Sequence, residues 1–314
     1  MIRLLELFGG IGACTKAMER IGVEFEVVDY VEIDKYAVAS YNAIHGTHYD
    51  PQDIQKWDKN VEVDLIMHGS PCQDFSLSGK QAGGDEGSGT RSSLMYETLR
   101  IVAKLRPKYV IWENVKNVLS DKHKHNFDKY INRMQELNYE SFYQVLNSKD
   151  YGIPQRRERA FVVSIRKDMQ QGFIFPSKQE LKLSLRDLLE ENVDEKYYLT
   201  DKMIEYISAT GTKNFSYEPE IDLDIARPLT SSMHKMHRVG TDNYVSDSFV
   251  KNNEKLNIKE ATKKGYAEAY DGDSVYLGFP NSKTRRGRVG HQISQTLQCD
   301  GNMGVVVRRK ESYE

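Results

Sequence analysis

Short apolar runs alternate with helical stretches through the first half of this 314-residue chain, and no other feature constrains the fold as strongly. The runs have the length and flanking turn residues of buried strands, and the stretches between them have helical apolar spacing. Strands are predicted over 2–8, 25–31, 63–67, 109–112, 143–146 and 159–165, and helices over 13–21, 35–44, 92–105 and 125–137. This alternation is typical of βαβ units, so we predict an α/β domain with a mostly parallel sheet. Ligands of such sheets bind outside the carboxyl ends of the strands.

The pattern changes after about Pro176. The stretch 184–210 is charged and helical in pattern, and the strand-like runs that follow alternate with turns without a βαβ rhythm. A chain of this length can form one large domain and a smaller one. We predict a first domain over 1–175 and a second over 176–314.

The charge and the cysteines exclude several classes of protein. The net charge of −2 means that any nucleic-acid binding must come from local basic patches. Cys14, Cys72 and Cys299 lie far apart and have neither disulfide-framework nor zinc-ligand spacing. His123 and His125 lie in a lysine-rich stretch and are expected to be solvated, so no metal site is predicted. Without a long apolar run or a signal peptide, we expect a cytoplasmic protein.

A glycine turn joins the first predicted strand to the first helix, in Phe8-Gly9-Gly10-Ile11-Gly12. Glycines let a ligand approach main-chain N–H groups at a helix N-terminus. The turn is not a GxGxxG motif, which counts against a nicotinamide cofactor. Glu32 follows the second strand, where a carboxylate can accept hydrogen bonds from ribose hydroxyls. The alternative for Glu32 is a solvated surface carboxylate.

Cys72 follows Gly69-Ser70-Pro71 just past the third strand and precedes polar residues. A free cysteine is usually a small buried hydrophobe, but this polar setting disfavours a core position. A reactive cysteine requires surroundings that lower its pKa. The stretch 73–91 is rich in glycine and serine, which is typical of a loop that closes over a site or, alternatively, of a plain surface loop.

Glu113 ends the fourth strand, and Gln155-Arg156-Arg157-Glu158-Arg159 precedes another strand. Because residues alternate sides along a strand, Arg157 and Arg159 are predicted to point the same way. Two guanidinium groups on one side can hold a phosphate or a carbonyl oxygen. Taken alone, the run is more often a solvated charge cluster.

Five motifs in this order, all within residues 2–165, resemble the cytosine-C5 DNA methyltransferases. The motifs are Leu5–Gly12, Glu32, Gly69–Ser76, Glu113–Val115 and Gln155–Arg159, with Gly9 and Ala13 as mild departures. The resemblance implies a Rossmann-like S-adenosylmethionine-dependent methyltransferase domain and a smaller DNA-recognition domain. It also implies S-adenosylmethionine as methyl donor, S-adenosylhomocysteine as product, and double-stranded DNA as substrate.

The same resemblance implies roles for individual residues. Cys72 is expected to attack C6 of a flipped-out cytosine, Glu113 to contact N3 and the exocyclic amine, and Arg159, supported by Arg157, to hold the O2 side. The residues expected to bind the cofactor are Phe8, Gly10, Ile11, Gly12, Glu32, Ile33, Asp53, Ile54, Pro71 and Leu94. The residues expected to contact DNA are Gln73, Ser76, Ser78, Arg285, Arg286, Arg288 and Thr296. For the basic run that contains the three arginines, the alternative is a soluble turn.

The family continues beyond a Thr-Leu pair, here Thr296-Leu297, into a ninth and a tenth motif. Gly301-Asn302-Met303-Gly304 has only a faint likeness to the tenth motif, and the sequence given stops at Glu314. Both motifs are expected to be absent. Our hypothesis is that this chain is either the large subunit of a split enzyme, whose second polypeptide supplies them, or a truncated gene product, and that it is weak or inactive alone.

Three other functions stay open at this point. An RNA cytosine-C5 methyltransferase would share Cys72 and Glu113, a truncated homologue would bind DNA without catalysis, and a nicotinamide oxidoreductase would use the same fold. Neither the recognition sequence nor a role in a restriction–modification system follows from the residues.

Overall fold

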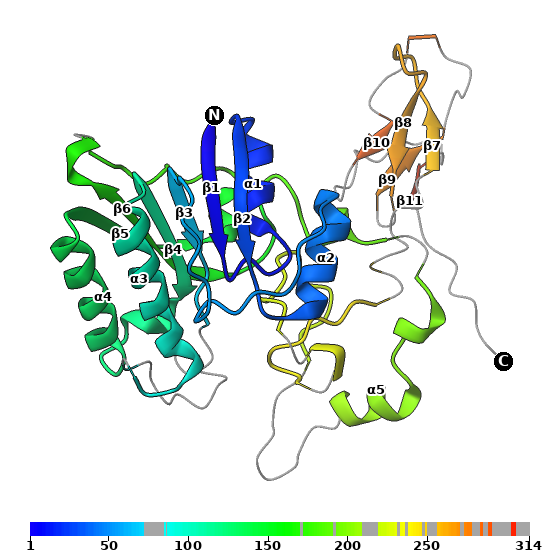
Figure 1. The fold of residues 1–314 in the computed structure, drawn as a ribbon. Coiled ribbons are helices and arrows are strands. Elements are labelled where there is room, and N and C mark those ends of the chain that lie inside the picture. The colour runs from blue at the N-terminus through cyan, green and yellow to red at the C-terminus, as the bar shows by residue number, and fades with distance from the viewer. Residues whose placement is uncertain are drawn as a thin grey trace. The chain divides into compact units, whose positions relative to one another are not determined.

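The computed structural model describes most of the first half of the chain and scattered segments of the second. The described residues are 1–71, 85, 87–169, 172–190, 193–208, 219–230, 233–235, 238–246, 249, 256–270, 273–277, 283–284, 288–290 and 303–305. The chain divides into two compact units, Met1–Leu181 and Lys182–Glu314. Figure 1 shows the helices and strands of both units.

The first unit is built around a six-stranded sheet of order β2-β1-β3-β4-β6-β5. Its strands are β1 (Ile2–Leu7), β2 (Phe25–Val31), β3 (Leu65–His68), β4 (Tyr109–Val115), β5 (Tyr139–Asn147) and β6 (Glu158–Arg166). β1 pairs in parallel with β2 and β3, and β3 pairs in parallel with β4. β6 is antiparallel to both β4 and β5. The α/β architecture with a mostly parallel sheet is therefore confirmed.

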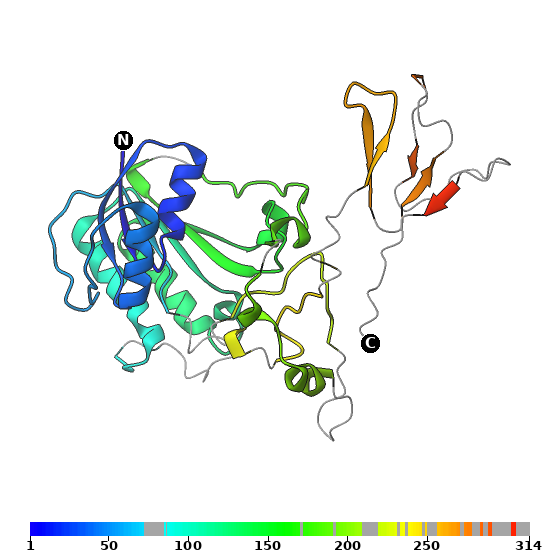
Figure 2. The same cartoon turned by 90° about the vertical axis from the view of Figure 1, so that its right-hand side faces the viewer.

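The helices cover the two faces of this sheet (Figure 2). They are α1 (Ala13–Ile21), α2 (Lys35–His45), α3 (Met95–Leu105) and α4 (Lys124–Glu136). Short 3-10 turns are η1 (Arg91–Leu94), η2 (Lys116–Leu119), η3 (Ser148–Tyr151) and η4 (Lys167–Met169). α3 and α4 pack on the face that carries Ile66 and Trp112, and Met18 of α1 packs on the opposite face against Leu4 and Leu65. Most of the buried apolar side chains of the first unit lie in the cluster on the α3–α4 face. Because each fully buried large apolar side chain contributes about 1.5–3 kcal/mol, this face supplies most of the hydrophobic stabilisation.

Local chemistry explains where the first two helices begin and end. Gly22 and Gly46 follow α1 and α2 in the left-handed conformation, which favours glycine and ends a helix. The Asp34 side chain accepts hydrogen bonds from the N–H groups of Tyr36 and Ala37 and so caps α2. Because Asp34 follows β2, this cap begins α2 at the carboxyl edge of the sheet.

The second unit contains little regular structure in its described part. The elements are η5 (Arg186–Leu188), η6 (Glu195–Tyr197), α5 (Asp201–Ser208), η7 (Met233–Lys235), β7 (Leu256–Lys259), β8 (Tyr266–Ala269), β9 (Ser274–Tyr276), β10 (Val289–Gly290) and β11 (Met303–Val305). β7 pairs with β8, and β9 lies between β10 and β11. Among the described residues of the stretch 184–210, which are 184–190 and 193–208, the helical pattern yields α5 and two short 3-10 turns. Leu188 and Tyr197 are exposed and so offer no packed face to a longer helix.

The prediction of a solvated surface was wrong for His123. Its side chain is buried at the start of α4, where the His123 N–H donates to the Ser120 carbonyl. His125 is half-exposed and lies 2.8 Å from Asp85. Within the described residues, no group of histidine, cysteine and acidic side chains could hold a metal ion. No helix among them has the length and apolar character needed to cross a membrane.

Candidate active site

A cavity of about 690 Å³ lies at the carboxyl edge of the parallel strands. The end of every parallel strand and the start of β6 contribute to its wall. The lining residues are Phe8, Val31, Glu32, Ile33, Asp34, Gln52, Asp53, Ile54, Gly69, Ser70, Pro71, Arg91, Leu94, Glu113, Val115, Arg157 and Arg159. This is the edge at which α/β sheets bind ligands.

The cavity brings together many of the residues that the sequence predicts for the site. From the cofactor set it gathers Phe8, Glu32, Ile33, Asp53, Ile54, Pro71 and Leu94, and from the catalytic set Glu113, Arg157 and Arg159. Gly10, Ile11 and Gly12 are not among its lining residues. Sequence reasoning missed Val31, Asp34, Gln52, Gly69, Ser70, Arg91 and Val115.

Glu32 is fixed by backbone N–H groups on two sides. Its Oε1 accepts from Ile33 N at 2.8 Å and Asp34 N at 2.9 Å, and its Oε2 accepts from Gly10 N at 3.1 Å. The carboxylate therefore joins the glycine turn to the end of β2. A carboxylate accepts about four hydrogen bonds, so one position, on Oε2, remains for a further donor.

The glycine turn owes its shape to packing behind the cavity. Gly12 has φ 88°, and an added Cβ would lie 2.2 Å from His45 Nε2, so α1 and α2 can meet only with glycine there. Ile11 is 59% exposed, away from the cavity lining. The predicted cofactor contacts of Gly10, Ile11 and Gly12 stay predictions.

Glu6, inside β1, takes the place of a side-chain cap for α1, because Gly12 has none to offer. The carboxylate is fully buried and accepts from Cys14 N at 3.3 Å and from the Thr15 hydroxyl. Burial raises the pKa of Glu6. An acidic residue within an otherwise apolar strand is the sequence signal that could have predicted this role of Glu6.

A second buried acid, Asp29 of β2, holds the turn that carries Asp53 and Ile54. Asp29 accepts from Gln52 Nε2 at 3.0 Å and from Trp57 Nε1 at 2.7 Å. Gln52 also donates its backbone N–H to the Glu32 carbonyl at 2.7 Å. Asp29 thus joins two walls of the cavity, a contact between residues too far apart in sequence to be predicted from spacing.

Glu113 meets both arginines predicted to lie beside it. Its Oε1 is 3.0 Å from Arg159 Nε and 3.5 Å from Arg157 Nη2. The antiparallel register pairs Val115 with Arg159, so the alternation along β6 places both guanidinium groups on the Glu113 side. The Glu113 side chain is 33% exposed, and Oε2 takes part in neither ion pair. A ligand in the cavity can therefore be met by an acceptor and two donors at one place.

The loop predicted to carry the nucleophile is described only at its base. Ser70 is buried, and Trp112 Nε1 donates to its Oγ at 3.0 Å. Cys72, Gln73, Ser76, Ser78, Arg285, Arg286 and Thr296 lie outside the described residues. Arg288 is described but only 3% exposed, and its backbone N–H donates to Glu260, so the exposed basic surface expected for it is not what the structure presents.

The residues present fit S-adenosylmethionine. A volume of about 690 Å³ lies within the usual range of small-molecule sites, which is about 300–1,000 Å³. Apolar side chains such as Ile33, Ile54 and Leu94 can face an adenine ring, while Glu32 keeps an acceptor position for a hydroxyl donor. The wall combines apolar surface with a few polar groups, as nucleoside-containing ligands require.

An α/β domain with a cavity at its carboxyl edge is typical of proteins that bind a small-molecule ligand there, and a solved structure has a similar fold. DNMT2 from Spodoptera frugiperda matches with a TM-score of 0.56 and 25% identity, over 67% of this chain and 66% of that chain.

Sequence comparison then identifies the family. The family model described as C-5 cytosine-specific DNA methylase matches residues 2–300, so this chain belongs to that family. Type II methyltransferase M2.ScrFI of Lactococcus lactis subsp. cremoris is 32% identical over 259 residues, which cover 65% of this chain and 72% of that protein. Orphan methyltransferase M.Rho11sI of Bacillus phage rho11s is 34% identical over 252 residues, 68% of this chain and 49% of its own length. The chain thus spans about half the length of the phage relative.

Proposed function

We propose that this chain transfers a methyl group from S-adenosylmethionine to C5 of a cytosine in double-stranded DNA. The observation that carries the proposal is the meeting of Glu113 with Arg157 and Arg159 beside the base of the Cys72 loop, at the wall of one cavity. An acceptor and two donors at one place match the polar edge of a cytosine. Membership of the family supports the same reaction.

The cofactor, when bound, supplies a methyl group on a positively charged sulfur. Ile33, Ile54 and Leu94 would hold its adenine by apolar contact, and Glu32 and Asp53 would accept hydrogen bonds from its ribose and amino groups. The apolar wall would also keep water from the reacting atoms.

The target base would be flipped out of the duplex, because enzymes cannot reach a stacked base. The Cys72 thiolate forms a bond to C6, and the electron pair of the C5–C6 bond becomes available at C5. Glu113 shares a proton with N3 and accepts from the exocyclic amine, so negative charge that develops on the ring is stabilised. Arg159 donates to the O2 side, with Arg157 in support. After methylation, loss of the C5 proton restores the double bond and breaks the bond between Cys72 and C6.

The experiment is covalent capture on duplex DNA that contains 5-fluorocytosine, with the cofactor present. Because fluorine at C5 cannot leave as a proton does, the wild-type chain should stay attached to the DNA. Cys72→Ser should form no adduct, and the matched variant Cys299→Ser should form it as wild type does. Absence of an adduct with wild type, or an equal yield with Cys72→Ser, would overturn the proposal.

A substrate panel separates DNA from RNA. Transfer of a labelled methyl group is measured on duplex DNA and on structured RNA of matched cytosine content. The proposal expects transfer to DNA, and transfer to RNA alone would replace it with the RNA alternative.

Roles in DNA contact belong to the same proposal. We assign the second unit to target recognition, with Arg285, Arg286 and Thr296, and the loop residues Gln73, Ser76 and Ser78, as DNA contacts. Phosphate contacts would position the duplex, and base contacts would select the sequence. The expectation of a second polypeptide depends on where the sequence given ends. Nothing in the described residues supports it, and it stays a prediction.

A further inference from the structure

The indole of Trp112 is held by aromatic rings on several sides. The ring of His68 lies parallel to it at 2° with centroids 5.9 Å apart, Tyr130 packs at 4.3 Å, and Phe127 stacks at 5.9 Å. Trp112, His68, Tyr130 and Phe127 are all buried. A ring enclosed in this way has one orientation, so the direction of its N–H group is fixed.

His68 is itself fixed within this cluster. Its Nε2 lies 3.0 Å from the Tyr130 hydroxyl, and its Nδ1 lies 3.5 Å from Thr98 Oγ1. Burial lowers the pKa of His68 to about 3, so the ring is neutral at ordinary pH and adds no charge next to the loop. The imidazole therefore acts through its shape and its hydrogen bonds.

Two donors of β4 converge on the same loop residue. Trp112 Nε1 donates to Ser70 Oγ at 3.0 Å, and Asn114 Nδ2 donates to the Ser70 carbonyl at 3.3 Å and reaches Ser70 Oγ at 3.4 Å. The N–H group of the buried Trp112 indole needs only one hydrogen-bond acceptor. Holding both the side chain and the backbone of Ser70 instead fixes the path of the chain two residues before Cys72.

The same strand carries Glu113 between these two donors. Because neighbouring side chains of a strand point to opposite faces, Trp112 and Asn114 reach toward α3 and α4 while Glu113 faces the cavity. The backbone at Gly69 lies close to Glu113, since an added Cβ there would be 3.7 Å from Glu113 Oε2. β4 thus ties the base of the nucleophile loop to the acid that meets the cytosine.

We propose that Trp112, clamped by His68, Phe127 and Tyr130, is a positioning residue that holds Ser70, two residues before Cys72, beside Glu113 through its hydrogen bond to Ser70 Oγ. The proposal rests on the function proposed above, with Cys72 as nucleophile. A small misplacement of a nucleophile is costly in rate, while the affinity for DNA and for the cofactor depends on other contacts.

The kinetic test deletes the hydrogen bond from each side. Trp112→Phe keeps an aromatic ring in the cluster and removes the N–H donor, and Ser70→Ala removes the acceptor. Each should lower kcat by about tenfold and leave the KM values for DNA and cofactor within about twofold. The double variant should be no slower than Ser70→Ala alone, because that substitution already removes the acceptor of the Trp112 N–H, together with the longer contact from Asn114 Nδ2.

A matched control separates positioning from a general loss of stability. Tyr139→Phe deletes another buried hydrogen bond, from the Tyr139 hydroxyl to the Pro107 carbonyl, on a strand outside the site. It should lower the free energy of unfolding by a similar amount and leave kcat unchanged. An independent readout is the pair of indole N–H resonances, since Trp57 and Trp112 are the two tryptophans of the chain. Ser70→Ala should shift the Trp112 resonance and leave that of Trp57 in place.

The outcomes distinguish the two proposals. A wild-type chain that stays inactive both alone and with a second polypeptide that carries the ninth and tenth motifs would remove the proposed function and, with it, the nucleophile that Trp112 is inferred to position. An active wild type whose Trp112→Phe and Ser70→Ala variants keep full kcat would overturn only the positioning role. A double variant about a hundredfold slower than wild type would also overturn it, because the two residues would then act independently.

Discussion

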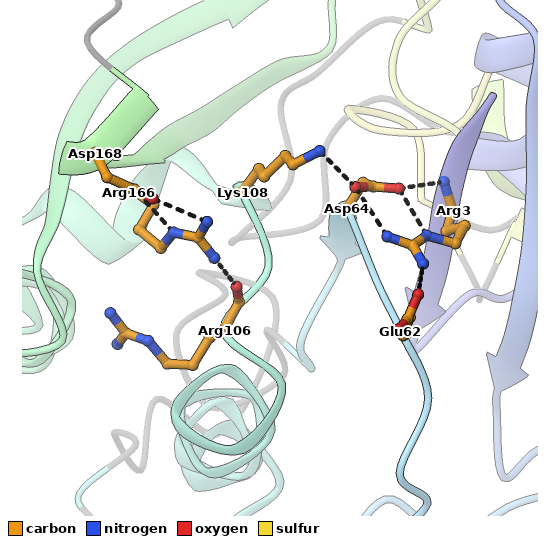
Figure 3. Close-up of polar contacts among 7 residues, drawn as sticks. All are labelled: Arg3, Glu62, Asp64, Arg106, Lys108, Arg166 and Asp168. Atoms are coloured by element: carbon orange, nitrogen blue, oxygen red, sulfur yellow. Dashed lines mark hydrogen bonds and ion pairs between the residues drawn. The ribbon is translucent and has the colours of Figure 1, made fainter.

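The two edges of the six-stranded sheet carry carboxylates in opposite arrangements. At the amino edge, Asp64 accepts from Arg3 Nε at 2.9 Å and forms an ion pair with Lys108 Nζ at 2.9 Å (Figure 3). Nearby, Arg166 binds Asp168 and donates to the Arg106 carbonyl. At the carboxyl edge, both ion pairs of Glu113 reach a single oxygen, Oε1.

Asp64 and Glu113 differ in how many of their acceptor positions are occupied by donors from within the chain. Asp64 Oδ1 meets Arg3 Nη2 and Lys108 Nζ, while Oδ2 meets Arg3 N and Arg3 Nε, so about four acceptor positions are occupied from within the chain. These donors, Arg3 first, hold the pKa of Asp64 well below its usual range. Within the part of the chain that the structure describes, Glu113 Oε2 takes part in neither ion pair of its residue, and Glu113 lines the cavity. A saturated carboxylate can only stabilise the fold, whereas an unsaturated one can receive a substrate.

The largest expected effect comes from removing the charge at the carboxyl edge. Glu113→Gln keeps the shape of the side chain but cannot share a proton with cytosine N3, so kcat for methyl transfer should fall by about 10²–10³. The melting temperature should stay within a few degrees, because Glu113 is one-third exposed and the arginines beside it can be solvated.

A fall in kcat without a loss of folding stability would support the contrast between Glu113 and Asp64. A variant that loses folding stability while keeping most of its kcat would place Glu113 with Asp64 among residues that hold the sheet together.

The matched substitution at the amino edge is Asp64→Asn, and the opposite pattern is expected. The amide would present donors to Arg3 and Lys108, and Asp64 is only 12% exposed, so the free energy of unfolding should fall by roughly 1–3 kcal/mol. Activity per folded molecule should not change. The measurement is urea unfolding followed by tryptophan fluorescence, which reports on the first unit because Trp57 and Trp112 both lie there.

Some of the site could be predicted from sequence because it depends on strand ends. Glu32 and Glu113 follow recognisable strands, and the carboxyl ends of parallel strands meet at one edge whatever else the chain does. That Arg157 and Arg159 point the same way follows from the alternation of residues along an extended chain, whereas their meeting with Glu113 depends on the antiparallel pairing of β4 with β6.

The parts that escaped prediction depend on contacts between distant segments. His123 lies in a polar stretch, yet the turn before α4 buries it, and no local pattern announces that. At Gly12, the neighbour that excludes a side chain is His45 on a different helix, and no local pattern predicts that contact. Asp29 and Gln52 meet only after β2 and the turn that follows α2 have both formed.

The smallest expected effect is a pH dependence that belongs to the amino edge. An aspartate whose pKa is lowered by folding contributes stability that is fully present above its unfolded pKa of about 3.9, and this stability is lost as the pH falls toward the folded value. The wild-type protein should have a higher free energy of unfolding than Asp64→Asn, and this difference should be smaller at pH 3.5 than at pH 7. The difference should shrink by a little less than 1 kcal/mol, roughly, between the two pH values. A difference that stays constant between these two pH values would show that Asp64 gains nothing from Arg3 and Lys108 as a charged group, and the contrast between the two edges would then lose its electrostatic basis.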